Sequence, residues 1–309
     1  TRHTKGVVYA GTHTIHVVDD DGGVWYAGWR GEGRLGNGAG VASSQWTLTR
    51  MAGVNDVVKF HQWMSAGIAL TRGGSVYYWP SPSYNNLEMP VGVFLGDDDN
   101  SAGSTYGLDG FTTSGRVTDV AGGEFDSGYQ HWCAVIEHTK LECWGANDQG
   151  QLGDGSATSS WTQPVAVTGL PAGNITSISV GRRTTCVVVD GRDAHQAKRA
   201  NSTAWCWGYN IYGGLGDGTQ TNRYTPVQVT NLADNVTQVS GGYHYTCALL
   251  AQGSVKCWGQ GNYGQRGDGS TVTTQKTPVS VSGLEDATIT QISCGLYHSL
   301  AVTGTGKVY

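Results

Sequence analysis

Short runs of alternating apolar and polar residues recur along the chain and are separated by glycine-rich turns. Residues 236–239 (Val-Thr-Gln-Val) alternate with the two-residue period of a half-buried strand. The apolar run 247–250 is followed by Ala-Gln-Gly at 251–253 and then by a second run at 254–258, which is the pattern of a β-hairpin. The pattern therefore predicts short antiparallel strands joined by tight turns.

A longer phrase repeats with these hairpins. Cys-Trp-Gly is followed by a glycine-rich stretch that ends in Gly-Asp-Gly, and about ten residues later by Pro-Val. The three strong copies lie at 143–155, 206–218 and 257–269. Glycine and aspartate tolerate the positive φ angles of a tight corner. A unit of roughly 50 residues that holds several short strands has the size of a propeller blade.

Weaker copies flank the strong ones. In the first copy, Tyr26-Ala27-Gly28 stands for Cys-Trp-Gly, and 33–38 keeps the glycine phrase. The second copy keeps Trp79 and Leu87, and is followed by an irregular stretch to Gly115. A sixth copy begins at Ile289 and is incomplete at Tyr309. The chain thus carries five repeats and part of a sixth.

The repeated phrase Cys-Trp-Gly-x-Asn-x-x-Gly-Gln-Leu-Gly-Asp-Gly, together with Pro-Val-x-Val, resembles the regulator of chromosome condensation repeat. The resemblance covers nearly the whole chain and implies an all-β fold, a β-propeller with blades of about 50 residues. We expect residues 1–309 to form a single propeller domain of six or seven blades. Because a blade that stops at Tyr309 would leave a strand edge unpaired, we also expect the domain to belong to a longer polypeptide.

Composition agrees with short strands and narrows the function. Glycine makes up 48 of the 309 residues, about twice its ordinary share. The net charge is −5 and there is no basic cluster, so the sequence gives little support to nucleic-acid binding. No apolar run approaches the roughly 18–20 residues of a membrane span.

Six of the seven cysteines occur in pairs at two fixed repeat positions. The first copy has Ile15 and Tyr26 at these positions and the second has Ile68 and Tyr78, so the two cysteines are present or absent together. The two positions face each other across a hairpin, where Cβ atoms come within disulfide reach. We predict three disulfides, with pairs of buried thiols as the alternative, and we expect Cys294 to be a buried thiol or to pair outside this segment. The predicted pairs are Cys133–Cys143, Cys186–Cys206 and Cys247–Cys257.

Three N-glycosylation sequons begin at Asn174, Asn201 and Asn235. Asn201 is the best candidate, because it follows a ten-residue insertion at a hairpin tip. Disulfides and sequons together predict an extracellular or cell-surface location.

Candidate catalytic groups all have a plainer structural interpretation. His13, His131 and His298 are assigned to one repeat position, two before the first cysteine, and a histidine repeated around a ring is better explained as a hydrogen-bonding group than as a base. The acidic runs at 19–21 and 97–100 could bind Ca²⁺, although neither has a known spacing and solvated loops explain them better. We therefore predict that the chain is not an enzyme and needs no metal or other cofactor.

Some aromatic residues do not follow the repeat and could lie on the surface. These are Trp25, Trp29, Trp46, Trp63, Trp132, Trp161 and Trp205. Exposed aromatic side chains on a rigid scaffold suit protein or sugar binding. We predict an extracellular, non-enzymatic protein-interaction or structural module, such as a part of an appendage, matrix or adhesin.

Two alternatives remain open. One is a carbohydrate-binding propeller, a lectin. The other is nucleotide exchange on a small GTPase, the activity that the resemblance implies, which the acidic balance and the expected disulfides disfavour. The partners that we expect are other proteins or glycans, including further copies or domains of the same assembly, with no nucleic acid and no membrane insertion.

Overall fold

The described part of the chain is built from strands and turns alone. The computed structural model describes residues 7–10, 14–28, 45–51, 54–63, 66–79, 93–95, 115–123, 130–191, 202–232 and 235–309, and no helix occurs in these ranges. Within them, 22 strands form six antiparallel sheets, five of four strands and one of two. The predictions of an all-β fold and of five repeats with a partial sixth are confirmed.

Each sheet is one blade, and its strands follow one another in chain order. Blade 1 contains β1 (Val7–Ala10), β2 (Thr14–Val18), β3 (Val24–Gly28) and β4 (Gln45–Arg50). Blade 2 contains β5 (Val57–Trp63), β6 (Ala66–Thr71), β7 (Val76–Trp79) and β8 (Val93–Leu95). Blade 3 contains β9 (Val117–Gly123), β10 (His131–Ile136), β11 (Lys140–Gly145) and β12 (Ser160–Ala166). Blade 4 contains β13 (Asn174–Gly181), β14 (Thr184–Asp190), β15 (Thr203–Gly208) and β16 (Arg223–Gln228). Blade 5 contains β17 (Val236–Gly241), β18 (Tyr245–Leu250), β19 (Val255–Gln260) and β20 (Thr274–Ser280), and blade 6 contains β21 (Ile289–Cys294) and β22 (Ser299–Thr303).

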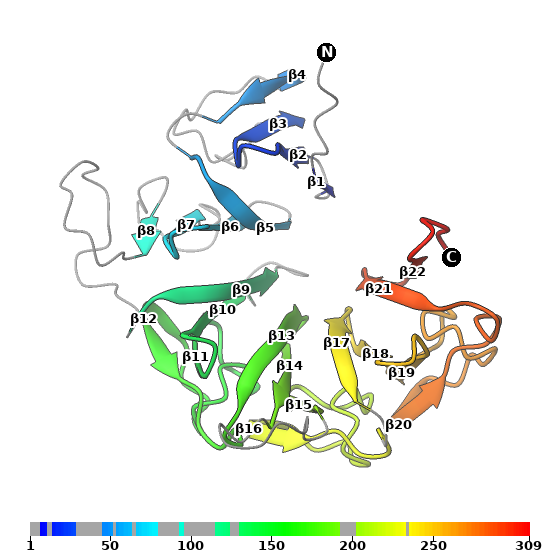
Figure 1. Cartoon of the computed structure of the whole chain (residues 1–309). Coiled ribbons are helices and arrows are strands. Elements are labelled where there is room, and N and C mark those ends of the chain that lie inside the picture. Colours follow the sequence, from blue (N-terminus) through cyan, green and yellow to red (C-terminus); the bar gives the residue numbers. More distant parts are fainter. Residues whose placement is uncertain are drawn as a thin grey trace.

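The blades are arranged around a common centre, with the first strand of each blade innermost (Figure 1). The first strands of successive blades contact one another from β1 to β21. Side chains lace the innermost strands of blades 4 to 6 together: the Ser179 hydroxyl accepts the Gly241 amide at 2.9 Å, and the Ser240 hydroxyl accepts the Cys294 amide at 2.9 Å. These bonds connect backbone donors of one blade to side chains of the blade before it.

The paired cysteines face each other across the hairpin of the second and third strands. In blade 3, Cys133 lies opposite Cys143 with a Cα–Cα distance of 4.1 Å, and the same distance separates the cysteines of blades 4 and 5. The structure contains the disulfides Cys133–Cys143, Cys186–Cys206 and Cys247–Cys257, while Cys294 is a buried free thiol.

The register of blade 1 corrects one part of the prediction. His16, not Ile15, lies opposite Tyr26, and Thr14, not His13, lies opposite Gly28 as His131 lies opposite Gly145. The predicted alignment of this copy was therefore wrong by one residue. Such a slip moves a side chain to the other face of the sheet; accordingly His16 is buried, whereas Ile15 is exposed.

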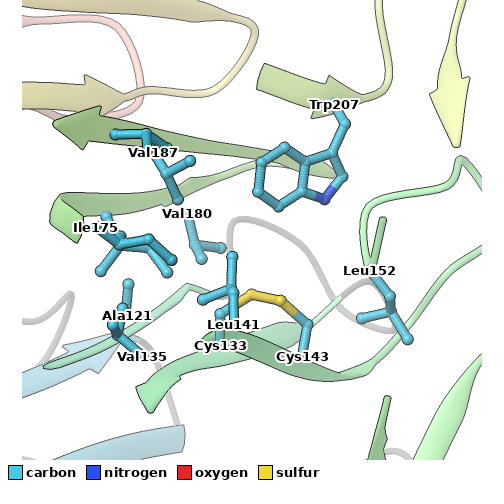
Figure 2. Close-up of a cluster of buried hydrophobic side chains, with 12 residues drawn as sticks. Ala121, Cys133, Val135, Leu141, Cys143, Leu152, Ile175, Val180, Val187 and Trp207 are labelled. Atoms are coloured by element: carbon cyan, nitrogen blue, oxygen red, sulfur yellow. A yellow bond between two sulfur atoms is a disulfide. The ribbon is translucent and has the colours of Figure 1, made fainter. Parts of the chain in front are cut away.

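In blades 4 and 5, the tryptophan of the repeated phrase joins the blade to the one before it. Trp207 of blade 4 is fully buried in a cluster with Leu152 and the Cys133–Cys143 disulfide of blade 3 (Figure 2). Its indole Nε1 donates to the Gln151 carbonyl of blade 3 at 2.9 Å, just as Trp258 donates to the Gly214 carbonyl at 2.8 Å.

The glycine phrase is required by this joint. Gly153 has a φ of 74°, and a Cβ there would lie 2.5 Å from the Trp207 indole nitrogen. Gly216 has a φ of 70°, and a Cβ there would lie 2.7 Å from the Trp258 indole nitrogen. A side chain at either position would be strained and would also collide with the indole. The glycines of the repeated phrase therefore allow a tight turn and leave room for the tryptophan of the next blade.

The loop after the third strand is held by a buried asparagine in blades 3 and 4. In blade 4, the Asn210 side-chain amide donates to the Asp217 carboxylate at 3.2 Å and to the Thr221 carbonyl at 3.1 Å, while its oxygen accepts the Leu215 amide at 3.0 Å. Asn147 makes the corresponding bonds in blade 3.

In blade 5, different residues hold the loop after the third strand. Gly261 stands in place of the asparagine, and Arg266 stands in place of the leucine. The Arg266 guanidinium donates to the Asp268 carboxylate at 3.1 Å and to the Val272 carbonyl at 2.7 Å, groups equivalent to those that Asn210 binds. A Cβ on Gly261 would lie 2.0 Å from Arg266 Nη1, so the arginine occupies the volume that the asparagine leaves.

Candidate interaction surface

Tyrosine, histidine and arginine gather at one end of blades 4 to 6. Antiparallel pairing places the turn between the first and second strands at the same end of a blade as the segment after the third strand. We call this the loop end of the propeller. The turns contribute Arg182, Tyr243, His244 and Tyr297, and the segments after the third strands contribute residues 209–212 and 261–263.

Six rings at the loop end form a continuous row, which we call the tyrosine cluster. It consists of Tyr209, Tyr212, Tyr243, His244, Tyr263 and Tyr297. The ring centroids of Tyr209 and Tyr212 lie 5.1 and 5.0 Å from that of His244, which lies 4.4 Å from that of Tyr243. The row continues from Tyr243 to Tyr297 at 5.4 Å and from Tyr297 to Tyr263 at 4.7 Å. It thus connects the loops of three blades.

His244 is the buried floor of the cluster, with 7% of its surface exposed. Burial lowers the pKa of its imidazole to about 3, and the charges of Arg182 and Arg183 lower the pKa in the same direction. The ring is therefore neutral at pH 7. Since an arginine always carries its protons, Arg182 Nη1 donates to His244 Nε2 across 3.0 Å.

Two arginines accompany the rings. The Arg182 guanidinium lies 4.4 Å from the centre of the Tyr243 ring, which is a cation–π contact. Arg183 forms an ion pair with Asp148 of blade 3, with 3.3 Å between Nη1 and Oδ2. Burial raises the pKa of the Tyr209 phenol above its ordinary value.

The exposed part of the surface lies mostly on the loops of blades 4 and 5. Tyr263 is 63% exposed and Tyr297 42% exposed, and Ile211 beside the cluster is also exposed. The loops that carry these side chains are rich in glycine and asparagine. Tyrosine, glycine and asparagine are the residues that antibody binding loops favour, because a tyrosine supplies a large amphipathic contact at low conformational cost.

The tryptophans singled out from the sequence do not build this surface. Trp132 is fully buried, Trp25 is half-buried and donates to Asp19 at 2.8 Å, and Trp205 is half-buried and donates to Thr203 at 2.9 Å. Trp161 lies half-buried at the start of β12. Trp29 lies outside the described residues, as do the side chains of Trp46 and Trp63. The signal that was missed is the aromatic pair that follows a glycine in the turns of blades 5 and 6, Tyr243-His244 after Gly242 and, one residue later, Tyr297-His298 after Gly295-Leu296.

The histidine and aspartate candidates have structural surroundings. His131 is fully buried, with its Nε2 2.8 Å from the Thr185 hydroxyl. Asp19 accepts the amides of Asp21 and Gly23 in its own turn, and residues 97–100 lie outside the described residues. Across the ranges that the structure describes, no three His, Cys, Asp or Glu side chains gather into a metal site, and no helix could span a membrane.

Two of the three sequons lie at the opposite end, where the innermost strands begin. Asn174 and Asn235 are half-buried, and the Asn235 side-chain oxygen accepts the Ser202 amide at 3.0 Å. Thr237, the threonine of the sequon at Asn235, donates to the Leu249 carbonyl where the strand register shifts. Thr290 donates to the Val302 carbonyl at the same kind of register shift, although it belongs to no sequon. The repeated threonine therefore has a structural role of its own. Asn201 lies outside the described residues.

A cavity of about 440 Å³ opens between blades 5 and 6 and is lined by Tyr263, Leu284 and Leu300 among others. Ser299 of β22 donates to the Gln265 carbonyl at 2.8 Å, as Thr246 of β18 donates to the Gly214 carbonyl at 2.9 Å. In the earlier joints the third-strand tryptophan fills the adjoining volume, whereas in blade 6 Val308 and Tyr309 pair with β22 and Tyr309 lines the cavity.

Comparison with known proteins identifies a known repeat between residues 143 and 302. The model of the Regulator of chromosome condensation (RCC1) repeat matches residues 143–188, 201–249 and 252–302, and a second model of the same repeat matches 236–265. Each of the three longer matches begins near the third strand of one blade and ends in or just after the second strand of the next, so the sequence repeat bridges two blades.

Similar proteins of known sequence cover nearly the whole chain. It is 28% identical over 304 residues to the Ultraviolet-B receptor UVR8 of Arabidopsis thaliana, a match to 96% of this chain and 62% of the receptor. It is 28% identical over 307 residues to the E3 ubiquitin-protein ligase HERC2 of Homo sapiens, a match to 98% of this chain and 6% of the ligase. The chain therefore spans less than two thirds of either relative.

Solved structures agree on the fold. Human WBSCR16 superimposes with a TM-score of 0.72 at 21% identity and covers 96% of this chain and 72% of its own. Yeast RCC1 (Prp20), solved with Kap60 bound, also gives 0.72, at 17% identity, over 99% of this chain and 69% of its own. The chain therefore contains three regulator of chromosome condensation (RCC1) repeats within residues 143–302, and it shares the β-propeller fold of these solved structures.

Proposed function

We propose that this chain is a non-enzymatic, extracellular protein-interaction module that binds its partner through the loop end of blades 4 to 6. The observation that carries the proposal is the tyrosine cluster with its two arginines. Tyrosine and arginine are enriched among the residues that dominate binding energy at protein interfaces. The loops that carry them are held by buried side chains, Asn210 in blade 4 and Arg266 in blade 5, so the surface is organised before a partner arrives.

Disulfides support the extracellular part of the proposal. Three bonds of the same kind, each within one hairpin, are stable in an oxidising compartment and uncommon in the cytosol. Glycosylation at Asn174, Asn201 and Asn235 belongs to the same proposal. Non-reducing peptide mapping of protein from its native source tests this part, and recovery of the six paired cysteines as free thiols would contradict it.

A sugar-binding propeller is the second candidate, and Tyr263 is the residue that favours it because more than half of its ring surface is exposed. Most of the other rings, however, lean on one another at interplanar angles of 36° to 62°. Tyr209, Tyr212 and Tyr243 are half-buried and each contacts a neighbouring ring, so they leave less open ring face than Tyr263 does. Sugars stack on open ring faces, whereas protein surfaces readily use ring edges and hydroxyls, and this arrangement favours a protein partner.

Photo-crosslinking tests the proposed face directly. Benzoylphenylalanine in place of Tyr263 should give a discrete crosslinked protein in the native extracellular material, and an excess of unlabelled wild-type chain should abolish it. The same group in place of Leu48, an exposed residue of β4 in blade 1, is the matched control. A pattern that is the same at both positions would count against the proposed face. Binding of both chains to a glycan array, abolished by Tyr263→Ala, would select the lectin instead.

A further inference from the structure

His244, at the base of the tyrosine cluster, has one ring nitrogen without a hydrogen-bond partner. Its Nε2 accepts a hydrogen bond from Arg182, so the single proton of the neutral imidazole lies on Nδ1. Nδ1 is buried, and no acceptor for it exists among the described residues. Buried donors in folded proteins nearly always find an acceptor, because an unmade hydrogen bond is costly. The Nδ1–H group is therefore a feature that the fold alone does not explain.

Gln260 carries the complementary group in the same blade. It is the last residue of β19, and its backbone amide donates to the His244 carbonyl at 2.9 Å. The Gln260 side chain is only 8% exposed, and its Oε1 is buried with no hydrogen-bond partner in the part of the chain that the structure describes. The loop end of blade 5 thus holds one donor and one acceptor that are both unsatisfied.

The rings around His244 control access to its donor. The half-buried rings of Tyr209 and Tyr212 flank the imidazole, with ring centroids 5.1 and 5.0 Å from its own. The Tyr243 ring lies at 4.4 Å, but a contact between an N–H group and a ring is weaker than one with an oxygen. Side chains commonly change rotamer when an interface forms, so a partner that turns one tyrosine aside would reach Nδ1.

We propose that the loop end binds the main chain of an extended segment of a partner protein, in which one peptide carbonyl accepts from His244 Nδ1 and one peptide N–H donates to Gln260 Oε1. This proposal rests on the function proposed above and adds the group that the surface recognises. An extended main chain carries both a donor and an acceptor on every residue except proline, and it leaves them open to a partner. The rings of the tyrosine cluster would pack against the side chains of the segment.

Peptides selected from a phage-displayed random library on the immobilised wild-type chain are the probes. Their affinity should fall at least about tenfold in His244→Phe, which keeps a ring but removes the N–H, and in Gln260→Met, which keeps the length but removes the acceptor. N-methylation of a synthetic peptide, one residue at a time, then locates the peptide N–H. At one position the methyl group should lower affinity for the wild type but lower affinity for Gln260→Met little further.

Thermal unfolding of Gln260→Met separates binding from a structural role. Because Oε1 has no partner within the described chain, the apolar replacement should leave the thermal midpoint unchanged or raise it, although peptide binding falls. His16→Phe is the matched control for His244→Phe. His16 is a buried histidine of blade 1 whose ring nitrogens also lack partners, and its replacement should leave peptide affinity unchanged.

Each other outcome overturns one proposal or both. Peptides that lose affinity in Tyr263→Ala but bind His244→Phe and Gln260→Met like the wild type would overturn main-chain recognition and leave the interaction surface in place. A lower thermal midpoint of Gln260→Met, or N-methyl effects equal in the two proteins, would also overturn main-chain recognition.

The interaction surface itself fails under different results. Peptides that bind all of these variants equally, or a library that yields no binder, would overturn both proposals. Binding of neutral glycans, but of no peptide, through His244 and Gln260 would replace the protein segment by a sugar, whose hydroxyls also donate and accept.

Discussion

Arg266 replaces a leucine that blades 3 and 4 carry at the same loop position, and we expect its loss to be costly. In Arg266→Leu, the Asp268 carboxylate and the carbonyls of Gly259 and Val272 lose the guanidinium donors that they share. The arginine is only 1% exposed, so water cannot freely replace it. Breaking a buried ion pair costs about 3–5 kcal/mol, and burial of the new leucine returns about 1.5–3 kcal/mol at most. The midpoints of these two ranges differ by about 2 kcal/mol, so we expect the free energy of unfolding to fall by about that amount.

The second half of the prediction is that Gly261→Asn rescues this loss. Alone, the new asparagine would collide with Arg266 Nη1, so Gly261→Asn should itself cost about 1–3 kcal/mol. Together the two changes recreate the Asn-Leu pair of blade 4, and the double variant should return to within about 1 kcal/mol of the wild type.

Urea unfolding of the four proteins, read as a double-mutant cycle, measures the coupling between residues 261 and 266. The reciprocal cycle in blade 4, with Asn210→Gly and Leu215→Arg, is a matched control and should show coupling of the same sign. Effects that add within about 0.5 kcal/mol in blade 5 would refute the claim that the two side chains share one volume and one set of acceptors.

Other predictions concern acid, redox state and the blade joints. His16 and His244 are buried, and burial lowers the pKa of each to about 3 from a reference of 6.5. As pH falls below 6.5, these histidines bind protons in the unfolded chain but not in the folded chain. Lowering the pH from 7 to 5 should therefore reduce the free energy of unfolding by about 2 kcal/mol for each histidine. Urea unfolding at both pH values should show a correspondingly smaller loss in His16→Phe. Reduction of the three disulfides should lower stability by about 3 kcal/mol for each hairpin, and the thermal midpoint should fall on adding dithiothreitol, whereas an unchanged midpoint would mean that the bonds do not constrain the unfolded chain. Trp258→Phe removes the donor to the Gly214 carbonyl and leaves a void between blades 4 and 5, so it should cost about 2–4 kcal/mol, and a neutral effect would contradict the role of the indole as an anchor.

The fold was predictable because the repeat carries several independent signals in register. Glycine at 153 and 216, tryptophan at 207 and 258 and the paired cysteines each mark a fixed place in the blade, and any one of them aligns the others. The first copy lacks the cysteines and the tryptophan, and there the predicted alignment slipped by one residue, so that Ile15 was assigned the place of His16. Register is thus readable only where a residue with a steric or covalent requirement occupies the position.

The exchange in blade 5 shows what a sequence pattern hides. Gly261 and Arg266 each read as an isolated departure from the repeat, a lost asparagine and a lost leucine. Only the structure shows that the guanidinium reaches the acceptors that the asparagine would have bound, because the sequence alone does not show that the two positions are close in space. Paired departures of this kind preserve the loop while they change its surface.

The proposed interaction surface also depends on residues that vary from blade to blade. The two residues in the turn between the first and second strands are Arg-Arg in blade 4, Tyr-His in blade 5 and Leu-Tyr in blade 6, at equivalent places. Their backbones are fixed by the repeat, while their side chains differ from blade to blade. The rings meet because neighbouring blades bring these turns together, although residues 182, 243 and 297 lie more than 50 positions apart along the chain. In a propeller of similar blades, a distinct surface therefore forms where the variable turns of adjacent blades contact one another. Specificity for a partner should be sought on that surface and not in the repeated motif.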